Sequence, residues 1–124
     1  MGTHLSTKGH GKPTTVLSAV NATADTVASL TAINCSGYTK LFVTYVCTAG
    51  WDRAGDIKIY GAVDGTNWVI ADTTVENGTF GVLATDDAGE YYVVENISPS
   101  IKVGWSRTTT GTTGTLTAKV MPFN

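Results

Sequence analysis

The chain has 124 residues, of which 42% are hydrophobic and only 15% are charged, with a formal net charge of -2 at pH 7. This length suits one domain with a core of its own. The charged fraction is below the roughly 25% of ordinary globular proteins, so Thr, Ser, Asn and Gly must coat the surface. The acidic balance excludes a basic nucleic-acid-binding face. No apolar run approaches the ~20 residues of a membrane span, so we expect neither a nucleic acid nor a membrane as partner.

Residues 1–12 contain Gly, Ser, Thr, Lys and both histidines, with Leu5 among them. Such a composition is typical of a flexible segment, so we expect an N-terminal arm over 1–12 and a single domain over 13–124. Two interpretations of the arm stay open: a disordered tail, or a segment that orders on a neighbouring subunit. The arm lacks the apolar stretch of a secretory signal, which favours synthesis in the cytoplasm of the producing cell.

Short runs rich in Thr, Val and Ile alternate with turn residues along the rest of the chain. Eight or nine strands with mostly short connections predict an all-β fold, an antiparallel two-sheet sandwich of jelly-roll type. The strand order stays open, because meander and Greek-key arrangements share these turn signals. The expected strands are Thr14–Val20, Thr26–Ile33, Lys40–Thr48, Asp56–Val63, Trp68–Val75, Thr79–Ala84, Glu90–Asn96, Ser100–Arg107 and Thr115–Met121.

Two of these runs carry the sharpest expectations. Lys40–Thr48 is apolar on both faces, which favours a central strand. Asp56–Val63 alternates, with Ile57 and Ile59 on one face. The pair Asp64-Gly65 that follows predicts a type I′ hairpin, whose two central residues both need positive φ.

The cysteines Cys35 and Cys47 are too few for a zinc site. Cysteines outside disulfides are commonly buried, which favours two buried thiols. A disulfide stays open, because it needs Cα atoms within about 7 Å of each other.

The sequence contains no residue pattern that favours catalysis, and we expect no enzyme, no cofactor and no metal. A nucleophilic triad needs a fixed histidine, and both histidines lie in the arm. The run Asp86–Glu90 lacks the spacing of a calcium loop. A carboxylate pair could serve a glycosidase, but the acidic residues fall mostly in predicted turns, where Asp bonds its own backbone. They are Asp52, Asp56, Asp64, Asp72, Asp86, Asp87 and Glu90.

The tryptophans are the most tempting binding residues. Trp68 and Trp105 lie in predicted strands, where packing explains them. Trp51 lies in the predicted loop Ala49–Ala54, beside Asp52 and Arg53. Aromatic residues and Arg dominate interface hot spots, so Trp51, Asp52 and Arg53 are the candidate contact residues for a partner or ligand. A buried core position for Trp51 is the open alternative.

The stretches Ser36–Thr44 (SGYTKLFVT), Tyr60–Trp68 (YGAVDGTNW) and Ile101–Ser106 together resemble small virion proteins of tailed bacteriophages. The resemblance runs from about Val16 to Val120 and includes head-decoration proteins, head fibres and tail accessory proteins. It implies a structural β-sandwich protein on a capsid or tail, usually a trimer or another symmetric homo-oligomer, and brings no catalytic residues.

The leading hypothesis from this resemblance is a capsid decoration protein that binds the major capsid protein on the outer surface of the virion. Low charge, abundant Thr and Gly, and a polar arm agree with it. The alternative is a carbohydrate-binding or receptor-binding module of a phage fibre or tail, with Trp51 and tyrosines as a stacking platform. We also expect the arm 1–12 or the terminal Met121–Asn124 to reach a neighbouring subunit.

Overall fold

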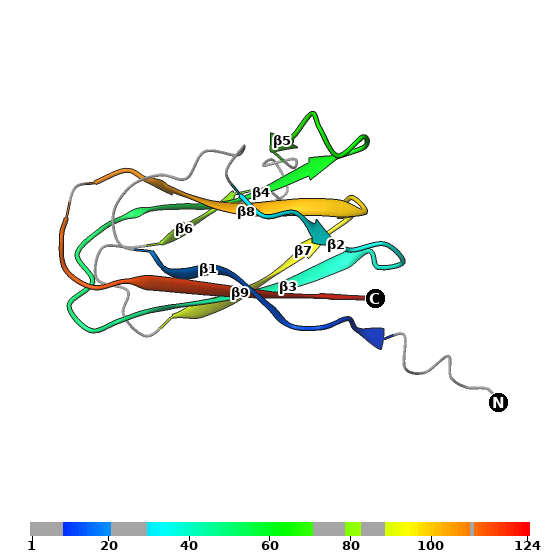
Figure 1. Cartoon of the computed structure of the whole chain (residues 1–124). Helices are drawn as coiled ribbons and strands as arrows, with labels where there is room; N and C mark the ends of the chain where they lie inside the picture. The colour runs from blue at the N-terminus through cyan, green and yellow to red at the C-terminus, as the bar shows by residue number, and fades with distance from the viewer. Residues whose placement is uncertain (1–8, 21–29, 71–78, 83–88, 110) are drawn as a thin grey trace.

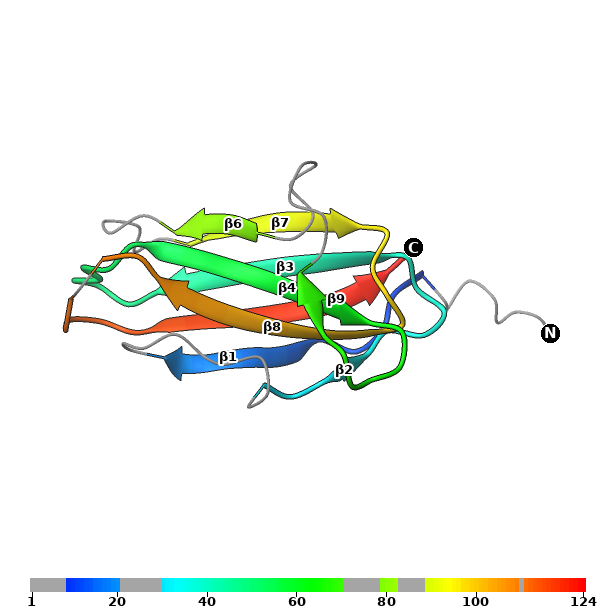
Figure 2. The same cartoon turned by 90° about the horizontal axis from the view of Figure 1, so that it is seen from above.

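The computed structural model describes residues 9–20, 30–70, 79–82, 89–109 and 111–124. Within these ranges the chain forms nine strands in two antiparallel sheets that face each other (Figures 1 and 2). The described residues contain no helix that could cross a bilayer. The strands are β1 (Thr14–Val20), β2 (Ile33–Asn34), β3 (Lys40–Cys47), β4 (Gly55–Ala62), β5 (Val69–Ile70), β6 (Thr79–Val82), β7 (Glu90–Glu95), β8 (Ser100–Arg107) and β9 (Leu116–Phe123).

The strand order gives the sandwich its jelly-roll topology. Sheet A has the order β1-β9-β3-β7, and sheet B has the order β2-β8-β4-β5, with β6 also paired to β4. The first and last strands are neighbours in sheet A, and β2 and β8 are neighbours in sheet B, so the chain crosses between the sheets at nearly every connection. The expected all-β sandwich of jelly-roll type is confirmed.

Strand β3 is central, as expected, because β9 and β7 pair along its two sides. Its side chains nevertheless alternate between buried and outward positions, with Leu41 and Val43 in the core and Val46 55% exposed. The central position expected from its apolar sequence is therefore correct, although only one face of β3 lies in the core. A sandwich layer buries one face only, so the second apolar face lies on the outside of sheet A.

The hairpin expected after β4 is confirmed, but the prediction of a type I′ turn is wrong. Strand β5 pairs with the end of β4, and Gly65 has φ of 73°, while Asp64 does not have positive φ. The carboxylate of Asp64 instead accepts backbone N–H bonds from Thr66 (2.9 Å) and Asn67 (2.8 Å), and a side-chain bond from Asn67 (2.7 Å). An Asp that bonds its own loop stabilises a longer connection than a type I′ turn.

Several strand bounds agree with expectation. The bounds of β1 and β8 coincide with the predicted runs, and Ile57 and Ile59 are buried on one face of β4. Much of the expected strand Thr26–Ile33 lies outside the described residues. Strand β9 continues past Met121 to Phe123.

The described part of the N-terminal arm lies along the end of β9. The N–H of Gly11 donates to the carbonyl of Pro122 (2.7 Å), and the N–H of Asn124 donates to the carbonyl of Gly9 (3.0 Å). The side chain of Asn124 accepts from the N–H of Thr39 (3.1 Å). Both described ends of the chain therefore lie at one end of the sandwich (Figure 1). Residues 1–8 lie outside the described part.

Both cysteines are buried, and no disulfide joins them. Cys35 directly follows β2, in the turn before β3, where the N–H of Tyr38 donates to its carbonyl (3.1 Å). Cys47 ends β3, seven residues beyond Lys40, which is roughly 20 Å of strand. Burial raises the pKa of the Cys35 thiol to about 11, so this thiol is poorly reactive at neutral pH.

Candidate functional site

One end of the sandwich, here called the closed end, contains Trp51, Asp52 and Arg53 with Trp105 and the segment 111–114. The Trp51 ring is 4% exposed and packs edge to face on Trp105, at 5.6 Å between ring centres. The Arg53 guanidinium lies 4.3 Å from the centre of the Trp51 ring. Trp51 is therefore a core side chain, the alternative that the sequence left open, and the loop around it is folded inward.

The Arg53 side chain is fully buried and bonds its loop to the distant segment 111–114. Its Nη2 donates to the carbonyl of Thr113 (2.8 Å) and to that of Gly114. Its Nε lies 3.5 Å from an Asp52 oxygen, and Nε and Nη1 have no hydrogen-bond partner. A buried guanidinium with two unsatisfied nitrogens costs desolvation energy, which its bonds and the Trp51 ring partly offset.

Asp52 bonds to the same 111–114 segment from the surface side. Its carboxylate accepts from the backbone N–H groups of Thr112 and Thr113, both at 3.1 Å. These bonds, that from Thr112 first, and the nearby Arg53 charge lower the pKa of Asp52 below its ordinary value. Of the three candidate contact residues, only Asp52 reaches solvent. The arrangement holds the 111–114 segment over the core.

Two of the candidate carboxylates bond to side chains or backbone close to them in the structure. Asp64 bonds its own loop, and Glu90 accepts hydroxyl bonds from Tyr45 (3.3 Å) and Tyr92 (2.9 Å). Asp72, Asp86 and Asp87 lie outside the described residues. Within the described ranges, no three His, Cys, Asp or Glu side chains cluster as metal ligands.

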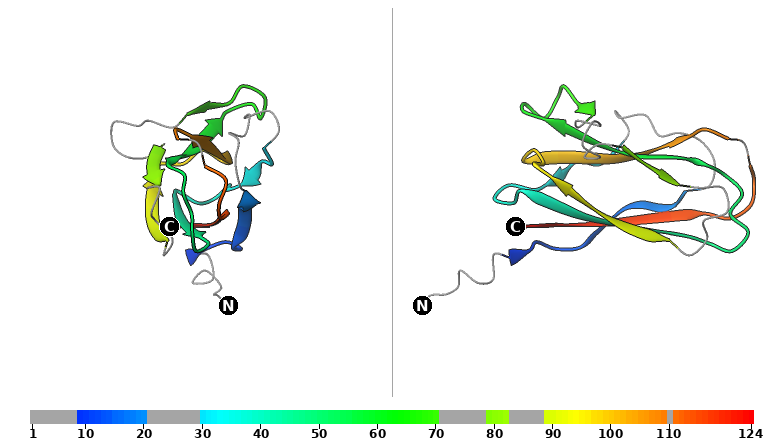
Figure 3. Two further views of the ribbon diagram at one scale, coloured as in Figure 1. Left: turned by 90° about the vertical axis from the view of Figure 1, so that its left-hand side faces the viewer. Right: turned by 180° about the vertical axis from the view of Figure 1, so that it is seen from behind.

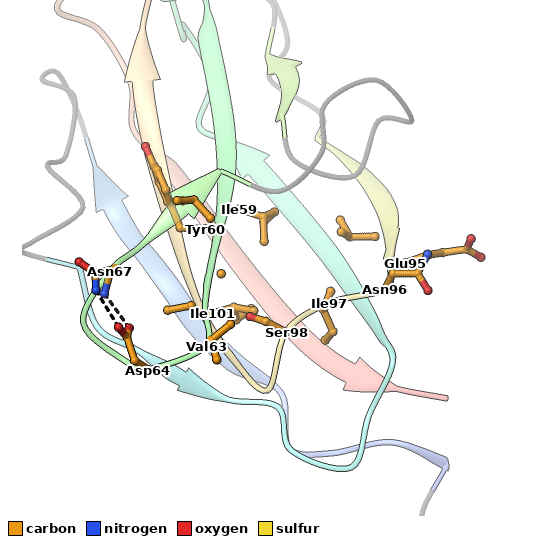
Figure 4. Close-up of a pocket in the computed structure, with 14 residues that line it drawn as sticks. Ile59, Tyr60, Val63, Asp64, Asn67, Glu95, Asn96, Ile97, Ser98 and Ile101 are labelled. Atoms are coloured by element: carbon orange, nitrogen blue, oxygen red, sulfur yellow. Dashed lines mark hydrogen bonds between the residues drawn. The ribbon is translucent and has the colours of Figure 1, made fainter.

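The opposite end, here called the open end, has a hollow of about 380 Å³ between the two sheets (Figure 4). It lies between the end of β4 with its following loop and the end of β7 with the connection to β8. Its apolar lining includes Ile59, Val94, Ile97 and Ile101, and Val63 at its rim is fully exposed. An open apolar hollow of this kind is a binding feature that the sequence pattern did not indicate.

The outer face of sheet A carries a second apolar surface, here called the sheet A patch: Phe42, Val46, Tyr91, Val93 and Phe123. The Tyr91 ring is 65% exposed and stacks on Phe42, with 5.1 Å between ring centres and 10° between planes. Phe123 meets Phe42 edge to face at 6.4 Å. The apolar outward residues of β3 were the sequence signal for this patch, but the apolar character of both faces was interpreted only as the mark of a central strand.

No known family model matches the sequence, and no curated protein matches it. Among solved structures, the chain is similar to the SPBc2 prophage-derived protein YomS, with a TM-score of 0.56, 13% identity, and coverage of 91% of this chain and 92% of that one. It is also similar to a Bacillus endospore appendage protein from disulfide-linked pili, with a TM-score of 0.53, 13% identity, and coverage of 91% and 85%. At this identity the likeness shows a shared fold.

Proposed function

We propose that this chain is a non-enzymatic structural protein of a phage virion. In this proposal it binds the major capsid protein on the outer surface of the particle, as a symmetric homo-oligomer with a trimer favoured, and stabilises the capsid. The observation that supports the proposal most is the sheet A patch.

An antiparallel sheet with one solvated face normally alternates apolar and polar residues. In sheet A, four of the seven outward positions of β3 and β7 are instead apolar. They are Phe42, Val46, Tyr91 and Val93, and the other three are Lys40, Thr44 and Glu95. Contiguous apolar surface of this kind marks an interaction site, and aromatic side chains supply much of the energy of such contacts. The sheet A patch can contact a partner, and the charged fraction of the whole chain is low. Both features suit a protein that works inside an assembly.

The solved structures of similar fold agree with a structural role. One is described as prophage-derived and the other as a component of pili. A decoration protein repeats one contact at many equivalent sites, so each copy needs only modest affinity when the copies are joined in an oligomer.

The test is co-sedimentation of the purified chain with phage heads, together with its mass by light scattering. We expect stoichiometric binding that Tyr91→Asp weakens strongly, because a charge replaces an aromatic contact. Ser18→Asp, which changes an exposed residue on β1 at the opposite edge of sheet A, is the matched control and should bind like the parent. A parent chain that stays in the supernatant with every head preparation would refute the proposal.

The second candidate function is carbohydrate binding by a fibre or tail module. The observation that favours it is the Tyr91 ring, which lies nearly parallel to Phe42 and leaves a flat aromatic surface in solvent. A glycan screen should then give binding without any capsid, and Tyr91→Ala should abolish it while Tyr91→Phe retains it. Binding that survives Tyr91→Ala would place any sugar site elsewhere.

A further inference from the structure

The hollow and the point where the N-terminal arm leaves the sandwich lie at the same end of the molecule. Gly9 and Gly11 bond to the last residues of β9, and Asn124 contacts the turn before β3. The β4–β5 loop and the β7–β8 connection lie at this same end (Figure 1), and the hollow opens between them (Figure 4). The binding feature and the start of the arm are thus at one end.

We propose that the hollow receives residues 1–8 of a second copy of this chain, with the Leu5 side chain inserted between the sheets. This inference rests on the proposed function, since it gives the oligomer a specific contact between subunits. It assigns the hollow to self-assembly and leaves the sheet A patch for the capsid.

Charge complementarity supports this occupant. The acidic side chain at the rim of the hollow is that of Asp64, whereas the Glu95 side chain points away from the hollow (Figure 4), and the described lining residues include no Lys or Arg. Backbone N–H bonds, that of Asn67 first, lower the pKa of Asp64 to about 2, so its carboxylate is charged at neutral pH. The arm is the complement: residues 1–12 contain Lys8 and Lys12 and no acidic residue.

The shape of the hollow supports the same occupant. Half of its lining residues are aliphatic, and a volume of about 380 Å³ leaves room for one large aliphatic side chain and neighbouring backbone. Leu5 is the single branched aliphatic residue in the sequence 1–8, MGTHLSTK. The exposed Val63 and Val69 at the rim would be covered by the backbone on either side of it.

The chain direction favours a neighbouring copy over the same molecule. Strand β1 is antiparallel to β9, so moving from Thr14 back to Gly9 follows β9 towards its C-terminal end. At Gly9 the backbone therefore heads past Asn124, out of the sandwich. Eight extended residues reach at most roughly 26–29 Å, enough to enter a molecule packed end to end.

Cysteine cross-linking between two differently tagged chains tests this contact directly. One chain carries Leu5→Cys and the other Val63→Cys, at the exposed rim of the hollow; oxidation should give a mixed dimer on a denaturing gel. The buried native thiols Cys35 and Cys47 make poor competitors. Leu5→Cys mixed with Ser18→Cys, an exposed site on β1, is the matched control and should give little product. No mixed dimer above this control would overturn the proposal.

A chain that carries both Leu5→Cys and Val63→Cys distinguishes the two possible sources of the arm. Cross-linking that falls on dilution supports exchange between copies, whereas a bond within one chain that persists on dilution overturns it. Leu5→Asp, which places a charge at the proposed contact, should weaken self-association by about tenfold to a hundredfold in sedimentation equilibrium. These measurements involve no capsid, so a chain that decorates heads without the cross-link would refute this inference and leave the proposed function standing.

Discussion

The two ends of the sandwich differ in how they use their side chains. At the closed end, Trp51 and Arg53 turn inward, and Asp52 holds the 111–114 segment over them. At the open end, Asp64 satisfies only its own loop, and aliphatic side chains surround a hollow. Figure 3 shows the sandwich from the closed end and from behind. A Trp, an Arg and an Asp in one loop therefore stabilise the fold here, while the surface suited to a partner is built from residues of ordinary apolar type.

The largest effect should come from Trp51→Ala at the closed end. Removing a buried aromatic ring that packs on Trp105 and carries the Arg53 guanidinium should lower the free energy of unfolding by about 3–5 kcal/mol. Urea unfolding followed by circular dichroism measures it. At the open end, Val69→Ala should change stability by no more than about 0.5 kcal/mol. Equal losses at the two ends would remove the distinction between them.

Arg53→Met should be destabilising by less than Trp51→Ala, by about 1–3 kcal/mol. The loss of bonds to the carbonyls of Thr113 and Gly114 is partly offset, because two buried nitrogens without partners are removed as well. The same urea experiment measures it. A stability equal to or above that of the parent would mean that the guanidinium makes no net contribution to closing this end.

Two glycines with similar backbones separate steric room from backbone strain. Gly114 has φ of 80°, and an added Cβ would lie 2.9 Å from the Trp51 Cα; Gly65 has φ of 73° and nothing within 4 Å. Gly65→Ala should lower the free energy of unfolding only by the strain of a left-handed backbone, about 1–2 kcal/mol. Gly114→Ala should lower it by more. Thermal unfolding of both variants measures the difference, and a larger loss for Gly65→Ala would contradict the tighter packing of the closed end.

The smallest effect concerns pH at the open end. The pKa of Asp64 is about 2 in the folded chain and about 3.9 in an unfolded one. Its contribution to stability is therefore fully present above about pH 4 and is lost as the pH falls towards 2. Urea midpoints between about pH 5 and pH 2 should fall more steeply for the parent than for Asp64→Asn. Parallel pH profiles would show that the loop bonds contribute nothing.

Local sequence pattern was enough for the fold class and for most strands. Strands β1 and β8 begin and end where the predicted runs between turn residues do, and Ile57 and Ile59 share the buried face of β4. These features depend on a period of two and on turn residues a few positions apart. The hairpin near Asp64 was likewise visible, although the bonding of its side chain selected a different turn.

The tertiary structure alone decided the strand order, the burial of Trp51 and Arg53, and the exposure of the sheet A patch. Each depends on which distant segment lies alongside: the 111–114 segment covers Trp51, whereas nothing among the described residues covers the outward side of β3. Alternation in a strand says that two faces differ, but it does not say which face another layer will cover. For this reason the residue types in the sequence indicated a sandwich, and only long-range packing separated its closed end from its open one.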